Sequence, residues 1–156
     1  MSTAVDPIGS AEQSERGSTH ARLALEQVCS GRQLERVGDF YRQDFVDHVN
    51  DGTFYGLDGA RQSVELYRWA FPDLAVEVEH QVAQGDAIAS RWIMRGTCRG
   101  RRVAMRGITI SHLSDGKIAE DWSYSDTVGL LRQLGLLRSA MLGVRWIASS
   151  RRAARG

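Results

Sequence analysis

The chain has 156 residues, the size of one ordinary domain, which argues against a two-domain enzyme and against a large barrel. Apolar residues make up 42% and charged residues 25%, a balance typical of a folded globular protein rather than a disordered one. There are 20 Lys and Arg residues against 19 Asp and Glu residues, so the net charge is close to neutral. A general nucleic-acid binder is normally far more basic, and we therefore expect no nucleic-acid partner.

No run of 18 apolar residues is present, so the sequence predicts no transmembrane helix and no membrane partner. Residues 1–17 lack the basic start and the apolar core of a secretory signal. Two cysteines, Cys29 and Cys98, do not make a disulfide framework. We therefore expect the protein in the reducing cytoplasm.

The first part of the chain predicts a leader followed by helices. Residues 1–18 are rich in Ser, Gly, Glu and Gln and have few large apolar side chains, so we expect a disordered leader. Helical spacing of apolar residues predicts helices near 19–31 and 34–41. A third helix is expected near 59–71, with Asp58 as its N-cap and a proline directly after it.

After the third helix the apolar period changes to two, which predicts strands joined by tight turns. The expected extended segments there are 74–79, 87–97, 103–113 and 117–124, and a further one, 44–50, precedes the third helix. Asp126 is expected to cap a last helix that ends at Gly135. Helices followed by a meander of strands indicate an α+β fold, in which a curved antiparallel sheet wraps around the N-terminal helices and encloses a small-molecule pocket.

This domain is expected to span residues 19–135. Residues 136–156 contain five arginines among apolar residues and no acidic residue, so they are read as a basic amphipathic C-terminal extension. Three interpretations stay open for it: a final helix packed on the domain or on a second subunit, a frayed end, or a contact with an anionic membrane surface or partner.

The strongest candidate for chemistry is Asp121, on the last expected strand. Alternation places Asp121 and Ser123 on one face of this strand. The opposite face carries Ile118, Glu120, Trp122 and Tyr124. A carboxylate on a central strand cannot face a filled core unpaired, so Asp121 faces either a polar cavity or solvent. In a cavity it would serve as a general acid or base.

A second group of polar residues, Asp47, His48 and Asn50, follows the first two helices. Asp47 or His48 could pair with Asp121 across a pocket. Two ionisable groups in a partly dry cleft push their pKa values apart, which creates one acid and one base. The alternative for His48 is a histidine at the surface or at the core edge, held by a backbone hydrogen bond.

The remaining candidates are substrate-binding residues. Trp92 and Met94 lie on the neutral face of their strand and would supply an apolar wall. The hydrogen-bonding candidates are Asn50, Thr109, Ser123 and Asp126. The four histidines are scattered, and neither a phosphate loop nor a dinucleotide fingerprint is present, so we expect no metal and no cofactor.

Several short motifs occur in order along residues 19–135. They are Phe45–His48, Ala70–Leu74, Gly85–Asp86 followed by Arg91–Trp92, Gly96–Thr97, Gly107–Ile108, Gly116–Ile118 with Trp122 and Asp126, and Gly129–Gly135. Together they resemble the SnoaL-like polyketide cyclases of the nuclear transport factor 2-like (cystatin-like) fold, in which helices and a curved sheet form a cone. The resemblance implies a homodimer paired through the outer face of the sheet. It also implies ring closure by an intramolecular aldol reaction, using an acid/base carboxylate and neither cofactor nor metal.

The last strand departs from the family in one respect. Members commonly have Glu-His-Trp-Asp where this chain has Glu120-Asp121-Trp122-Ser123. The carboxylate is therefore displaced by one inward-facing position, about 7 Å along the strand.

These considerations predict a cofactor-independent cyclase of polyketide or other secondary metabolism, such as antibiotic biosynthesis. It would close a ring in an apolar, polyketide-like small molecule by aldol-type or epoxide-opening chemistry. Asp121 would act as the acid/base, and Asp47 or His48 as its partner. Two alternatives stay open: a SnoaL-like hydroxylase working with a partner reductase, and a non-catalytic ligand-binding or assembly module.

Overall fold

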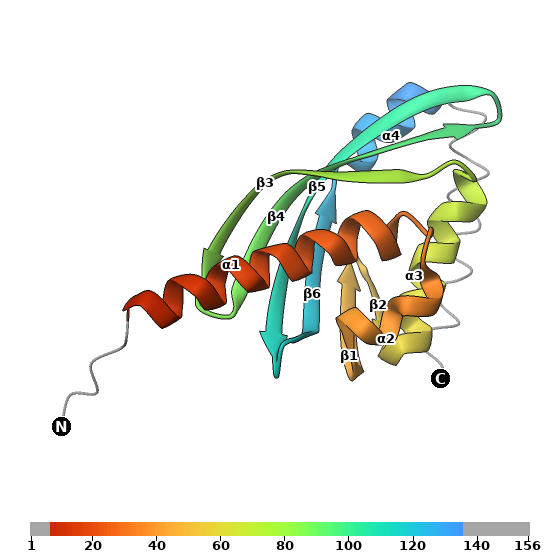
Figure 1. Cartoon of the computed structure of the whole chain (residues 1–156). Helices are drawn as coiled ribbons and strands as arrows, with labels where there is room; N and C mark the ends of the chain where they lie inside the picture. Colours follow the sequence, from red (N-terminus) through yellow and green to blue (C-terminus); the bar gives the residue numbers. More distant parts are fainter. Residues whose placement is uncertain (1–6, 136–156) are drawn as a thin grey trace.

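The computed structural model describes residues 7–135, and this part of the chain forms a six-stranded sheet packed against helices (Figure 1). The elements in chain order are α1 (Pro7–Leu23), the π-helical η1 (Ala24–Cys29), the 3-10 turn η2 (Leu34–Arg36), α2 (Val37–Phe40), β1 (Tyr41–Val49), β2 (Gly52–Tyr55), α3 (Gly56–Ala70), β3 (Ala75–Gln84), β4 (Ala87–Cys98), β5 (Arg101–Ser114), β6 (Lys117–Ser125) and α4 (Thr127–Leu134). The expected C-terminal extension, residues 136–156, lies outside the described residues.

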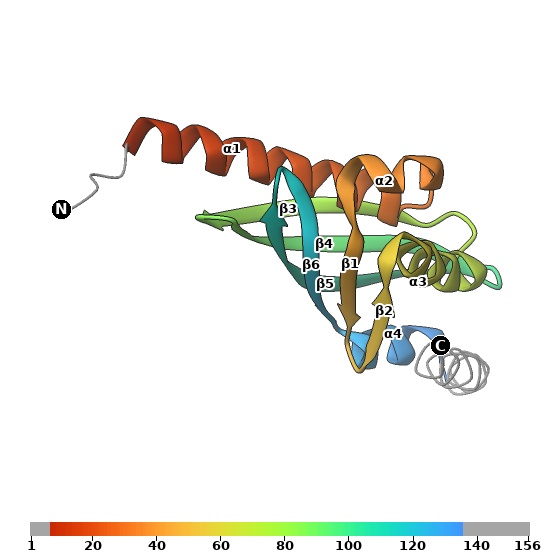
Figure 2. The same cartoon turned by 90° about the horizontal axis from the view of Figure 1, so that it is seen from below.

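The sheet is curved and has the strand order β2-β1-β6-β5-β4-β3. Neighbouring strands run antiparallel, except that β1 and β6 run parallel. Helix α1 runs along β3 and β4, whereas α3 lies against β1 and β2 (Figure 2). This arrangement confirms the predicted α+β fold with a curved sheet. The short strand β2 and the parallel pairing were not predicted, because alternation within a strand does not reveal which strand it pairs with.

Helix α1 begins inside the segment for which disorder was predicted. The structure places its first residue at Pro7, and proline suits the first position of a helix because its missing N–H would have no helical partner there. Its later part packs on the sheet through small groups. Gly17 is buried, with the Ile88 side chain beside it, and Gln81 Nε2 donates to the Ser18 carbonyl over 3.0 Å. Such a contact needs no large apolar residues, so the helix has no apolar stripe that a pattern search could find.

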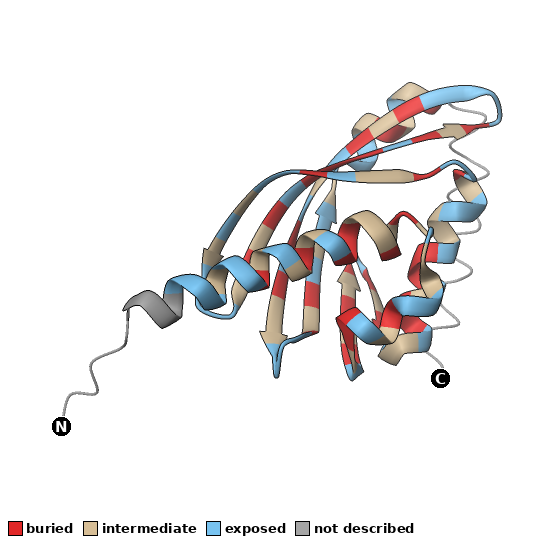
Figure 3. Ribbon diagram, in the orientation of Figure 1, coloured by how far each residue is buried: buried red, intermediate tan, exposed pale blue. Residues whose placement is uncertain are grey.

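Two clusters of buried residues stabilise the domain. Figure 3 shows that buried positions, in red, occur on both the strands and the helices. One cluster joins η1 and the link between α3 and β3 to strands β3, β4 and β5 and to α4. Its larger members are Leu25, Phe71, Leu74, Trp92, Met94, Met105 and Leu134. The second lies under α2 and β1 and includes Val28, Phe40, Tyr41, Phe45 and Ile118.

Most turn and cap predictions agree with the structure. The hairpin glycines Gly85 and Gly116 have positive φ values of 61° and 76°, a conformation that glycine adopts without strain. Asp126 caps α4, and its Oδ1 accepts from the Gly129 N–H over 2.8 Å. Helix α3 begins earlier than expected, at Gly56, so Asp58 lies in its first turn and pairs with Arg61 instead of capping the helix. No helix in the described part of the chain is long and apolar enough to cross a membrane.

Strand β6 contains an irregularity that changes which residues share a face. Its register against β5 shifts near the start, where His112 pairs with Glu120 but Leu113 pairs with Ile118. One extra residue in β6 reverses the alternation at that point. Ile118 is therefore buried, on the inner side with Asp121, and not on the outer face with Trp122 and Tyr124 as strict alternation predicted.

Candidate active site

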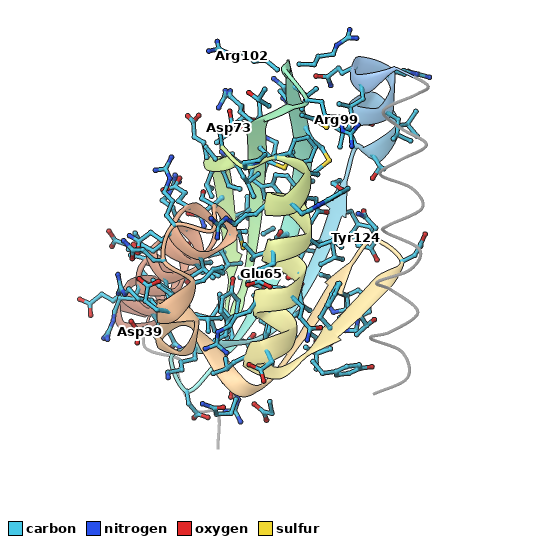
Figure 4. All side chains as sticks on the ribbon, turned by 90° about the vertical axis from the view of Figure 1, so that its right-hand side faces the viewer. Asp39, Glu65, Asp73, Arg99, Arg102 and Tyr124 are labelled. Atoms are coloured by element: carbon cyan, nitrogen blue, oxygen red, sulfur yellow. The ribbon has the colours of Figure 1, made fainter. Side chains whose placement is uncertain are left out.

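A cavity of about 80 Å³ lies between the inner face of the sheet and the helical segments η1 and α3. Both buried clusters contribute to its apolar wall. In Figure 4 α3 stands in front of the sheet, with the exposed Glu65 on it. The polar groups of the cavity come mainly from β1, β5, β6 and α3.

Two carboxyl groups face this cavity side by side. Asp47 on β1 and Asp121 on β6 are direct partners in the parallel pairing of the two strands, and both line the cavity. Adjacent strands lie about 4.8 Å apart, so the two side chains start from neighbouring positions on the same face. Their exposed fractions are 8% and 5%, so neither carboxyl group is in bulk water.

The two carboxyl groups differ in their hydrogen bonding. Asp47 Oδ2 accepts from the Ser63 hydroxyl of α3 over 2.9 Å. Asp121 Oδ1 is buried and has no hydrogen-bond partner among the described residues. A buried oxygen without a partner is costly in a resting protein, and it is available to a bound molecule.

The two carboxyl groups also differ in pKa. The pKa of Asp121 is raised to about 8, chiefly by burial and also by the nearby charge of Asp47, while a hydrogen bond with Ser111 offsets part of the increase. Burial raises the pKa of Asp47 only to about 6, because the Ser63 hydrogen bond and the nearby His48 favour its charged form. At neutral pH the pair therefore holds one proton, on Asp121, beside an ionised Asp47. This arrangement can supply an acid and a base to the same substrate.

Sequence reasoning missed several polar residues of the cavity wall: Cys29, Tyr41, Ser63, Tyr67 and Ser125. Burial raises the pKa values of the Tyr41 and Tyr67 hydroxyls well above 10 and that of the Cys29 thiol to about 12, so all three stay protonated. Cys29 Sγ and the Tyr41 hydroxyl are 3.7 Å apart. Ser63 and Tyr67 could have been found, because they are four residues apart on the predicted third helix and so share its inner face.

Four of the predicted substrate-binding residues do line the cavity: Trp92, Met94, Thr109 and Ser123. Three of them form a hydrogen-bonded chain across three strands. Trp92 Nε1 donates to Thr109 Oγ1 over 2.9 Å, and Thr109 Oγ1 lies 2.8 Å from Ser123 Oγ.

His48 is on the opposite face of the sheet from the cavity, which corrects its candidacy as the acid/base partner. It follows Asp47 on β1, and successive side chains of a strand point to opposite faces. Its ring stacks on Trp122 at 3.8 Å between centroids, Nε2 is 3.1 Å from Glu120 Oε1, and Nδ1 is 3.3 Å from Thr53 Oγ1. Of the two partners that the sequence left open, the structure places only Asp47 beside Asp121.

Asn50 and Asp126 do not line the cavity, so the expectation that they bind substrate is also corrected. Asn50 occupies the turn after β1 with a positive φ of 51°, and its side chain bonds both the backbone N–H and the hydroxyl of Ser125. It therefore ties the β1–β2 turn to the end of β6. Asp126 is exposed, and its carboxylate is used as the cap of α4.

Within residues 7–135, no three side chains of the kinds that ligate metals come together. The cavity offers only the two carboxyl groups and the Cys29 thiol as candidate ligands.

Comparison with known proteins identifies the family of this domain. The sequence profile of the SnoaL-like polyketide cyclases matches residues 19–134. The chain belongs to this family. The motifs that resemble SnoaL-like cyclases are thus part of a match over most of the chain. A search of the curated proteins found no match.

Solved structures of similar fold agree with this assignment. A candidate polyketide cyclase of Bacillus cereus is 27% identical with a TM-score of 0.73, over 85% of this chain and 89% of that chain. IdmH of Streptomyces antibioticus, also a candidate polyketide cyclase, is 27% identical with a TM-score of 0.68, over 77% of this chain and 99% of that chain. A Catenulispora acidiphila protein with a ketosteroid isomerase-like fold is 17% identical with a TM-score of 0.66, over 72% and 90% of the two chains. The SnoaL-like domain described above therefore has the nuclear transport factor 2-like fold that the resemblance implied.

Proposed function

We propose that this SnoaL-like protein closes a ring in a small molecule by acid/base catalysis, with protonated Asp121 as the acid and ionised Asp47 as the base. The observation that carries the proposal is the buried pair of carboxyl groups facing one cavity, one of them with an unpartnered oxygen. The two relatives that are 27% identical are described as candidate polyketide cyclases, which supports the same class of reaction.

In an aldol-type closure, Asp47 removes a proton from the carbon next to one carbonyl group of the substrate. The resulting enolate attacks a second carbonyl carbon of the same molecule, and Asp121 donates its proton to the oxygen of that carbonyl. One carbon–carbon bond forms, and the proton gained by Asp47 balances the proton lost by Asp121. The same pair suits the opening of an epoxide, in which Asp47 takes the proton of an internal hydroxyl and Asp121 protonates the epoxide oxygen.

The cavity restricts how a substrate is held. Its volume of about 80 Å³ accommodates several water molecules but is below the roughly 300 Å³ at which pockets for drug-sized ligands begin. An apolar, polyketide-like substrate would therefore place only its reacting end between the two carboxyl groups, unless wall side chains move. Holding two reacting carbons of a flexible chain close together would itself accelerate ring closure.

We also propose that the protein is a homodimer that pairs through the outer face of the sheet. Four large apolar side chains are exposed there in two adjacent cross-strand pairs, Ile108 with Tyr124 and Ile110 with Trp122. Beside them, Arg91 and Arg95 of β4 pair with Glu79 and Glu77 of β3. An apolar centre with charged groups at its edge is the usual anatomy of a protein interface.

Cys29 and Cys98 are both free thiols, in keeping with the reducing cytoplasm that we propose as the location of the protein.

The proposal is tested with two small probes followed by NMR. For aldol closure the probe is 2,6-heptanedione, whose terminal methyl group can attack the far carbonyl to form a six-membered ring. For epoxide opening it is 4,5-epoxypentan-1-ol, which closes to a cyclic ether. The wild-type protein is compared with Asp47→Asn and Asp121→Asn, and with Ser90→Ala as a control, because Ser90 is buried on β4 but does not line the cavity.

We expect the wild-type protein and the control to close one of the probes, and each carboxyl variant to lose about 10²–10⁴-fold in rate. The rate should rise with pH through about 6, where Asp47 ionises, and fall through about 8, where Asp121 loses its proton. Equal rates for the wild-type protein and both carboxyl variants on both probes would overturn the proposal. Oxygen uptake that depends on a reduced substrate would instead identify a hydroxylase, and binding without turnover a ligand-binding module.

A further inference from the structure

The chain of hydrogen bonds from Trp92 through Thr109 to Ser123 has a direction that can be deduced. An indole N–H can only donate, so Thr109 Oγ1 is the acceptor in the 2.9 Å contact with Trp92 Nε1. Thr109 must still place its own hydroxyl hydrogen. Its side chain is 1% exposed, and Ser123 Oγ, 2.8 Å away, is the other side-chain partner that the structure gives it.

The direction of the second bond follows. If Ser123 donated to Thr109, the Thr109 hydroxyl hydrogen would be buried without an acceptor, which is energetically costly. Thr109 therefore donates to Ser123. The hydroxyl hydrogen of Ser123 is then free, and Ser123 lines the cavity.

We propose that Ser123 is a fixed hydrogen-bond donor for a carbonyl or ether oxygen of the substrate. It lies two residues from Asp121 on the same face of β6, so its hydroxyl is displaced from that carboxyl group by about 7 Å along the strand. Strand β6 thus offers the cavity two donors for substrate oxygens, the acid Asp121 and the orienting residue Ser123. The identity of the ligand, a ketone or epoxide substrate that undergoes ring closure, rests on the proposed function. The direction of the hydrogen bonds does not.

The indole that sets this direction is held in place by the strand next to it. A Cβ atom on Gly107 of β5 would lie 2.3 Å from Trp92 Cζ2, so the absence of a side chain at this position is what lets the ring lie across β5. Trp92 is buried, and its only hydrogen-bonding atom is occupied by Thr109. It therefore acts on the substrate subsite through Thr109, as a positioning residue.

The inference is tested by the binding of cyclohexanone labelled with ¹³C at the carbonyl, followed by NMR. This ketone only accepts hydrogen bonds, and its carbonyl shift reports on donors. We expect Ser123→Ala to weaken binding about two- to tenfold and to shift the carbonyl signal toward that of the free ketone. Ser90→Ala, a buried serine on the inner face outside the cavity, should leave both unchanged.

A double-mutant cycle tests the direction of the chain. In Trp92→Phe the Thr109 oxygen loses its donor and is free to accept from Ser123, which turns the Ser123 hydrogen away from the cavity. Thr109→Val removes the hydroxyl altogether and frees Ser123 to adopt other orientations. Adding Ser123→Ala to Trp92→Phe should therefore cost less affinity than Ser123→Ala costs in the wild-type protein, whereas independent sites would give equal losses.

This experiment tests the role of Ser123 separately from the proposed acid/base catalysis, because it measures binding of a ketone and not turnover. In an Asp121→Asn background, Ser123→Ala should still weaken cyclohexanone binding by a similar factor. An unchanged affinity in Ser123→Ala, or no saturable binding of the ketone by the wild-type protein, overturns the inference. Circular dichroism establishes that each variant is folded, and Ser123→Gly is the second variant if Ser123→Ala is not.

Discussion

Asp121 and Asp47 are carboxyl groups that the fold holds in a cavity where their charged forms are disfavoured. The folded-state pKa values, about 8 and about 6, both lie above the ordinary value of 3.8. For such groups the stabilising contribution is fully present below the unfolded-state pKa and is lost as pH rises through the folded-state values. The pair therefore destabilises the protein progressively from about pH 4 to about pH 8.

We expect the free energy of unfolding to fall as the pH is raised from 5 to 9, and Asp121→Asn to reduce this dependence and to stabilise the protein at pH 9. A shift of this size corresponds to several kcal/mol at most, on the order of 1.4 kcal/mol for each pKa unit. Urea denaturation at a series of pH values measures it. Asp51→Asn, in an exposed turn, is the control. A steeper pH dependence in Asp121→Asn than in the wild-type protein would contradict the assignment.

At the scale of elements, much of the site could be predicted because it depends on the period of two in β4, β5 and β6. Alternation put Trp92 and Met94 on one face of β4, and Asp121 and Ser123 on one face of β6, with the choice between a cavity and solvent left open for Asp121. In the structure all four line the cavity. The same rule separates Asp47 from His48, although reading these two residues as one polar cluster concealed the distinction. The extra residue in β6 that turns Ile118 inward and the pairing of β1 with β6 could not be predicted, since both depend on contacts between distant segments.

The N-cap of α4, Asp126, can be tested both for its contribution to the stability of the helix and for the predicted role in substrate binding that the structure corrects. Asp126→Ala removes the cap of the Gly129 N–H and should lower the free energy of unfolding by about 1 kcal/mol, whereas Asp126→Asn should retain most of the stability. Urea denaturation measures both variants. Cyclohexanone affinity should stay unchanged in both, because Asp126 does not line the cavity. A loss of affinity with unchanged stability would return Asp126 to the binding site.

At the scale of the whole molecule, the distribution of side chains divides the outer surface into regions. Figure 4 shows Arg99 and Arg102 at the β4–β5 end of the molecule, together with Asp73. This end is exposed, as a solvated hairpin end should be. The apolar pairs lie farther along β5 and β6, and they are the part of the sheet that the proposed dimer would cover.

The dimer is tested by placing a charge in that apolar region. We expect the wild-type protein to sediment as a dimer and Ile110→Arg to sediment as a monomer, because an unpaired guanidinium group would be buried in the interface. Val82→Arg, at an exposed apolar position on the edge strand β3, should remain a dimer. Sedimentation equilibrium at several concentrations measures the mass. A monomeric wild-type protein throughout this range would refute the proposal.

The parallel pairing of β1 with β6 also affects how the protein folds during its synthesis. Synthesis of β1 ends at Val49, yet its parallel neighbour β6 is not complete until Ser125 has been added. A nascent chain on the ribosome therefore carries Asp47 long before β6, with Asp121, has been synthesised. Contacts between residues so far apart in sequence are slow to form. Asp47 and Asp121 come together only when nearly the entire domain has emerged. The free-energy cost of burying the two carboxyl groups side by side therefore arises in the complete fold and not in the partly synthesised chain.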